Sequence, residues 1–147
     1  MKMLILVLVL ATIVGQARAQ EGHIRGLDKP TDCVMTRIKS IQGRLEGRSL
    51  RESGAAVEYE NGVYGVQYQL GENPDKDQPG YSDYWQQKTY EDNIVASRVG
   101  DPIKLCLVSI PLHCPNGDER GREYVALDLR NHRWWNLGDS EHMCGGA

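Results

Sequence analysis

Phenylalanine is absent from the chain, although seven tyrosines and three tryptophans occur among its 147 residues. Long apolar runs are absent after residue 14, and no block of basic residues is longer than two. A membrane-spanning helix needs about 20 consecutive apolar residues, so no span is expected beyond the N-terminal segment. Lysine and arginine total 17 against 20 aspartates and glutamates. Because nucleic acid requires a cationic protein surface, we set aside a nucleic-acid partner.

The one long apolar run lies between Lys2 and a small-x-small sequence that ends at Ala19. A charged start, a short apolar stretch and small residues at a cleavage site are typical of a secretory signal peptide. We therefore expect removal of residues 1–19 and export to the periplasm or the cell exterior. The length that remains suits a single domain. Residues 20–32 lack periodicity and predict a flexible N-terminal arm, followed by one β-rich domain over residues 33–147.

Four cysteines lie in the exported part: Cys33, Cys106, Cys114 and Cys144. An even number of cysteines in an oxidising compartment predicts two disulfides, for which three pairings exist. We favour Cys106–Cys114, because this pair closes the shortest loop, and it leaves Cys33–Cys144.

The clearest local pattern is a β-hairpin over residues 55–70. Asn61-Gly62 is a preferred two-residue type I′ turn, in which both residues need a positive φ. This turn would pair Tyr59 with Tyr64 and place both on one apolar face.

Alternation and turn signals predict the other elements. Residues 33–46 fit a helix by spacing and a strand by β-branched content, so both stay open. Residues 71–84 form a long polar connection. Strands are expected at 94–98, 103–110, 122–130 and 133–137, and the second is apolar enough for a central strand buried on both sides. The pattern predicts a mainly β fold, a small antiparallel sandwich or partly open barrel of five to six strands, with or without one short N-terminal helix.

Two adjacent tryptophans follow the turn residue His132. A tight hairpin there would set Leu129 opposite Trp134 and Asp128 opposite Trp135. Adjacent residues on a strand point to opposite faces, so only one tryptophan can enter the core.

The aromatic residues give the candidate binding surface, because an exposed aromatic ring suits a sugar or a protein contact. The candidate residues are Tyr81, Tyr84, Trp85, His132, Trp134 and Trp135.

A small hydrolase is the first alternative, using His142 with Ser140 or with a carboxylate such as Asp128 or Asp139. The string that starts at Gly138 resembles the GDS segment of lipolytic serine hydrolases, which implies a nucleophile at Ser140. In that family the segment opens an α/β domain. Here it lies near the C-terminus, and no G-x-S-x-G elbow is present.

A metal-handling protein is the second alternative, because His113-Cys114 and His142-Met143-Cys144 offer soft ligands. Exported cysteines normally pair, and no C-x₂-C or H-x₃-H spacing occurs. We therefore expect no metal and no cofactor.

Neighbouring carboxylates occur at Asp118 and Glu119 and at Asp139 and Glu141. Glycosidases place two carboxyl groups across a cleft, but charged loop tips are the ordinary position of such residues. We therefore predict an exported binding module without catalytic machinery, whose partner is a protein or a cell-wall glycan. The most specific form of this hypothesis is an inhibitor or immunity-type protein acting on a cell-envelope enzyme, because charge steers an acidic domain toward a cationic enzyme.

Overall fold

The computed structural model describes residues 26–67, 77 and 81–146. The expected signal peptide and most of the expected arm therefore lie outside the described residues. The elements are β1 (Cys33–Gly43), α1 (Leu50–Ser53), β2 (Ala55–Tyr59), β3 (Tyr64–Val66), α2 (Tyr81–Val95), β4 (Pro102–Ser109), β5 (Glu123–Asp128) and β6 (Trp134–Gly138).

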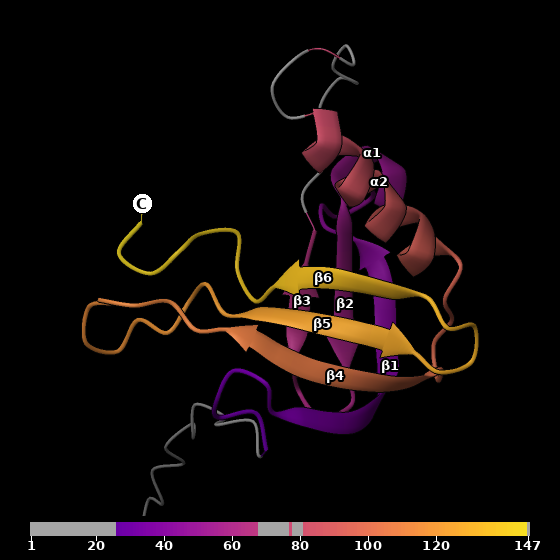
Figure 1. Ribbon diagram of the computed structural model, residues 1–147. Helices are drawn as coiled ribbons and strands as arrows, with labels where there is room; N and C mark the ends of the chain where they lie inside the picture. Colours follow the sequence, from indigo (N-terminus) through magenta and orange to yellow (C-terminus); the bar gives the residue numbers. More distant parts are fainter. Residues whose placement is uncertain (1–25, 68–76, 78–80, 147) are drawn as a thin grey trace, which may run out of the picture.

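Six strands close into an antiparallel barrel in the order β1-β2-β3-β6-β5-β4 (Figure 1). The first half of β1 pairs with β4 and the second half pairs with β2, so this long strand joins the two sides. The predicted mainly β, antiparallel fold with two disulfides is confirmed. The barrel is closed rather than partly open, and residues 33–43 are a strand.

The hairpin of β2 and β3 is present, but its predicted register is wrong by one residue. Tyr59 pairs with Val63 through its N–H at 2.9 Å, and the loop between them has three residues. Only Gly62 adopts a positive φ there, at 90°. The Asn61 side chain instead accepts the Val63 N–H at 3.3 Å. A slip of one residue reverses the faces of a strand, so Tyr64 is exposed and not in the core.

Strand β4 is not buried on both sides as predicted. Ile103, Leu105 and Leu107 are buried in the barrel, while Lys104 and Val108 are exposed. A barrel strand has one inner and one outer face, and the outer side of β4 is open to solvent at these two positions.

The hairpin of β5 and β6 pairs Leu127 with Trp134 and Ala126 with Trp135. The predicted register was wrong by two residues, because a longer turn, in which His132 has a φ of 61°, replaces the tight one. An even slip preserves the faces. One tryptophan therefore enters the core as predicted: Trp135 is buried and Trp134 is exposed.

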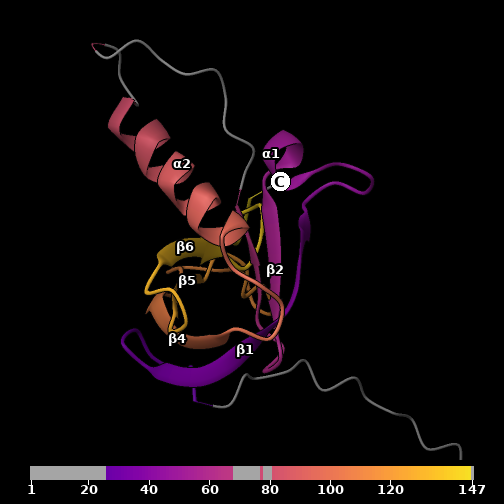
Figure 2. The same cartoon turned by 90° about the vertical axis from the view of Figure 1, so that its right-hand side faces the viewer.

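Helix α2 corrects two predictions, the polar connection to residue 84 and the strand at 94–98. Tyr90 and Ile94, one helical turn apart, are buried against the barrel, and the helix lies over β6 (Figure 2). Lys88 and Asp92 form an i,i+4 ion pair at 2.8 Å. Because the apolar stripe is so narrow, the sequence showed no helical pattern over these residues.

The favoured disulfide pairing is wrong. Cys33 bonds to Cys106, and Cys114 bonds to Cys144. Cys33 lies directly opposite Cys106 in the register of β1 and β4. Strand pairing, rather than proximity along the chain, therefore brought these two sulfurs together.

Candidate functional site

Trp134 is the most prominent exposed aromatic residue of the predicted set, with 47% of its surface accessible. Its ring packs against Tyr90 at a centroid distance of 5.2 Å. The Asn93 side-chain amide donates to the Trp134 carbonyl at 2.7 Å. Helix α2 therefore holds this half-exposed tryptophan in one place.

The other predicted aromatic residues do not form one continuous surface with it. Trp85 is 44% exposed and meets Tyr84 edge-to-face at 5.5 Å, toward the opposite end of α2. His132 is exposed in the β5–β6 turn. Tyr81 begins α2, and its side chain lies outside what the structure describes. Trp135 is fully buried, so its ring is not accessible to a partner.

An apolar surface that the sequence reasoning missed continues from Trp134 across the outside of the barrel. The cross-strand register places Trp134, Leu127, Lys104 and Met35 in one outward row over β6, β5, β4 and β1. Met35 is 63% exposed.

A second outward row lies beside the first and contains Asn136, Val125 and the Cys33–Cys106 disulfide. We call these eight residues the outer sheet face. Lys104 is its one charged residue. The alternation of residues 122–130 was visible in the sequence, but only the closed barrel shows that Val125 and Leu127 point outward.

A hollow of about 180 Å³, lined by polar and apolar side chains, lies where β3, α2, β5, β6 and the C-terminal tail, residues 139–146, meet. Gln67 lies in its wall, is 2% exposed, and donates through Nε2 to the Gln87 carbonyl at 2.6 Å. Gln67 Oε1 and Asn136 Oδ1 are buried, and no group among the described residues donates a hydrogen bond to either of them. Leaving such a group unsatisfied costs about 1–3 kcal/mol, so the wall of the hollow retains unused acceptor capacity.

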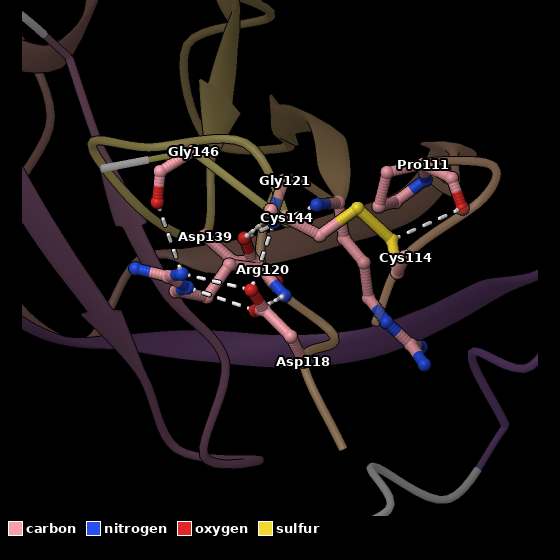
Figure 3. Close-up of a disulfide and its surroundings, with 10 residues drawn as sticks. Pro111, Cys114, Asp118, Arg120, Gly121, Asp139, Cys144 and Gly146 are labelled. Atoms are coloured by element: carbon pink, nitrogen blue, oxygen red, sulfur yellow. Dashed lines mark hydrogen bonds and ion pairs between the residues drawn. A yellow bond between two sulfur atoms is a disulfide. The ribbon is translucent and has the colours of Figure 1, made fainter. Parts of the chain in front are cut away.

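The tail beside the hollow is held by the loop between β4 and β5 (Figure 3). Asp118 accepts two hydrogen bonds from the Arg120 guanidinium at 2.8 Å and one from the Gly145 N–H at 3.0 Å. The hydrogen bonds from Arg120, with that from Gly145, hold the pKa of Asp118 well below its usual range. The Cys114–Cys144 disulfide adds a covalent link between loop and tail.

Asp139 is the second carboxylate of this clamp. Its Oδ1 accepts the backbone N–H groups of Gly121 at 2.8 Å and Arg122 at 3.1 Å. Burial raises the pKa of Asp139, and the two backbone hydrogen bonds oppose this shift. Asp118 and Asp139 therefore both serve to hold the loop and the tail together.

The structure meets one of the requirements of the hydrolase alternative. Ser140 and His142 both line the hollow, but their contact runs from the His142 backbone N–H to Ser140 Oγ, at 3.1 Å. Within the described residues no hydrogen bond joins the imidazole to Ser140 or Asp139. Asp128 lies at the other end of the barrel, where it accepts from Ser97 Oγ at 2.8 Å.

The metal alternative loses its thiolate ligands, because Cys114 and Cys144 are bonded to each other. In the part of the chain that the structure describes, no three His, Cys, Asp or Glu residues gather as a metal site. The same residues include no helix long and apolar enough to cross a membrane.

Comparisons of the chain with protein-family models, with curated proteins and with solved structures find no match.

Proposed function

We propose that the protein is an exported binding module that contacts another protein through its outer sheet face, with Trp134 as the anchor. The observation that carries the proposal is the fixed, half-exposed ring of Trp134 at the end of an apolar row. A tryptophan that is already held in place loses little conformational freedom on binding, and such residues dominate protein interfaces.

Export is supported by the signal-peptide pattern of residues 1–19 and by two disulfides, which persist in oxidising compartments. An inhibitor or immunity-type protein of a cell-envelope enzyme is the form that we propose, because covering an enzyme requires a rigid surface and no catalytic group.

The chemistry of the outer sheet face favours a protein over a cell-wall glycan. Sugar binding requires several hydrogen-bonding side chains around the aromatic ring, whereas the row from Trp134 continues with Leu127 and ends with Met35. Apart from Trp134 itself, only Lys104 and Asn136 of the face have hydrogen-bonding side chains. Methionine and tryptophan are enriched in protein interfaces. Lys104 lies within this row, so the matching surface should carry a carboxylate.

In-cell photo-cross-linking tests the proposal. A photoreactive amino acid replaces Leu127 in one variant and Tyr64 in a control, because Tyr64 is 41% exposed on β3, outside the four strands of the face. In the cells that naturally produce the protein, we expect the Leu127 probe to capture one defined protein and the Tyr64 probe to capture none of it. Adding Trp134→Ala should abolish the capture. Equal capture by both probes, no capture, or capture of wall glycan alone would overturn the protein-binding proposal.

A further inference from the structure

Two residues that line the hollow, Gln67 and Asn136, carry buried hydrogen-bond acceptors that the described residues leave without donors. A backbone carbonyl can only accept, so the bond from Gln67 Nε2 to the Gln87 carbonyl fixes the orientation of the Gln67 amide. The atom of Gln67 left without a donor is therefore its oxygen. Asn136 adds a second buried oxygen in the same condition.

The charged residues around the hollow are negative. Glu123 and Glu141 line it, and the described lining residues include no lysine or arginine. Among the described residues, Glu123 accepts a hydrogen bond from the neutral Ser109 hydroxyl at 3.2 Å, whereas Glu141 already pairs with Arg44. Glu123 is thus the carboxylate better placed to meet a cation.

The rest of the lining includes apolar side chains, among them Val66, Leu137 and Met143. A volume of about 180 Å³ far exceeds the roughly 10–15 Å³ that one bound water needs. The hollow therefore matches a group with an apolar stem and a head rich in N–H donors.

We propose that the hollow binds an alkylguanidinium or alkylammonium group, with the alkyl stem against Val66 and Leu137 and the charge beside Glu123. The oxygens of Gln67 and Asn136 are buried in the free protein, and a small rotation of the two amides on binding would bring Gln67 Oε1 and Asn136 Oδ1 to the N–H groups. Such cations bury their stems along apolar surface and keep the charge on acceptors. Charge-assisted hydrogen bonds to oxygen are the strong ones. The group belongs either to a basic side chain of a protein or to a free amine, and the recognition chemistry is the same.

Titration followed by NMR tests the chemistry on the full exported chain labelled with ¹⁵N. n-Butylguanidinium and n-butylammonium should produce saturable shifts of the Gln67 and Asn136 side-chain amides. Tetramethylammonium has the charge but no N–H, and n-butanol has the stem but no charge, so neither should saturate. Equal behaviour of all four compounds, or no saturable shift, would overturn the proposal.

Two variants locate the site. Asn136→Leu should abolish saturable binding of n-butylguanidinium. Glu123→Gln should weaken it about two- to fivefold, the range of a partly screened ion pair. Glu60→Gln, in the exposed β2–β3 turn, is the matched control and should change nothing. If Asn136→Leu fails to fold, Glu123→Gln tests the site, because Glu123 is exposed. Equal effects of Glu123→Gln and Glu60→Gln on binding would then contradict the assignment.

The two possible sources of the group are distinguished by comparing n-butylguanidinium with the peptide acetyl-Gly-Arg-Gly-amide. Comparable binding by both supports a side chain of a protein as the source, and binding of the free compound alone supports a small amine. Saturation by neither overturns the proposal. Trp134 and Leu127 do not line the hollow, so failure here leaves the cross-linking test of the outer sheet face intact.

Discussion

The indole N–H of Trp135 donates a hydrogen bond to the hydroxyl of Tyr59 at 3.1 Å inside the barrel. The two residues lie on β6 and β2, which are separated by β3 in the sheet, so the bond crosses the core rather than following a strand pair. Burial raises the pKa of Tyr59 well above its usual range, with the Trp135 bond opposing the shift. In a core whose other side chains are mostly aliphatic, two amphipathic aromatics thus satisfy each other's polar atoms.

This bond predicts strong coupling between the two residues. Tyr59→Phe leaves the Trp135 N–H without an acceptor, and Trp135→Phe leaves the Tyr59 hydroxyl without its donor, so each change should cost about 1–3 kcal/mol for the unpaired group. The double variant should lose less than the sum. Urea unfolding of the four proteins measures the coupling, and strictly additive losses would contradict it.

The ion pair between Arg130 and Asp101, at 2.7 Å, predicts a pH-dependent share of stability. The Arg130 hydrogen bond, with one from the Arg98 N–H, lowers the pKa of Asp101 in the folded state. A lowered carboxyl pKa stabilises the fold above the unfolded-state value and loses that effect as the pH falls through the folded-state value.

Arg130→Met should therefore lower the free energy of unfolding at pH 7, and its difference from wild type should shrink as the pH falls below about 3.8, the usual value for Asp101. Arg37→Met is the control, because Arg37 donates to the Gly100 carbonyl, which does not titrate. Denaturation at several pH values measures the free energy of unfolding of wild type and of both variants. A pH-independent effect of Arg130→Met would contradict the assignment.

The two carboxylates that hold the C-terminal tail should respond differently to neutralisation, because only Asp118 should lose stability. The raised pKa of Asp139 means that burial disfavours its charge, and an asparagine oxygen can accept the same two backbone hydrogen bonds. Asp139→Asn should match or exceed wild-type stability at pH 7. It should also remove the gain in stability that wild type shows as the pH falls through the raised pKa. Asp118→Asn should destabilise, because it weakens the Arg120 pair. Thermal melts at pH 7 measure the stability of both variants. Equal destabilisation by Asp139→Asn and Asp118→Asn would count against this interpretation.

The Cys114–Cys144 disulfide should contribute to stability chiefly by restricting the unfolded chain. Its sequence separation is 30 residues, for which loop-closure entropy suggests about 3–4 kcal/mol. Replacing both cysteines by serine should lower the free energy of unfolding by about that amount. Hydrogen exchange should also speed up at the Cys144 position, whose N–H is bonded to the Arg120 carbonyl. An unchanged free energy of unfolding would show that the loop and tail stay together without the bond.

Strand positions were predictable from the sequence where an apolar run was continuous, as in β4, or where alternation was long, as in β5. The register of the β2–β3 hairpin was not, because it depends on whether Asn61 adopts a positive φ or caps the turn with its side chain. Helix α2 was missed because Tyr90 and Ile94 are nearly its whole buried stripe. The Cys33–Cys106 disulfide follows strand pairing between β1 and β4, which local spacing cannot show.

The candidate site was also predictable only in part. Adjacent tryptophans on a strand must face opposite ways, and this placed one of them outside the core. The rest of the outer sheet face was not predictable, since Met35 and Leu127 come together only through the three paired strands β1, β4 and β5. The hollow draws residues from four separate segments, which no local pattern connects.

The central claim is that Trp134 anchors a protein partner on the outer sheet face. The direct test is the dissociation constant of the purified partner captured through Leu127, measured for wild type, Trp134→Ala and Tyr64→Ala. A hot-spot tryptophan contributes about 2 kcal/mol or more, so Trp134→Ala should weaken binding by about 30-fold or more, while Tyr64→Ala leaves it unchanged. Wild-type affinity in Trp134→Ala, with the fold intact, would contradict the account.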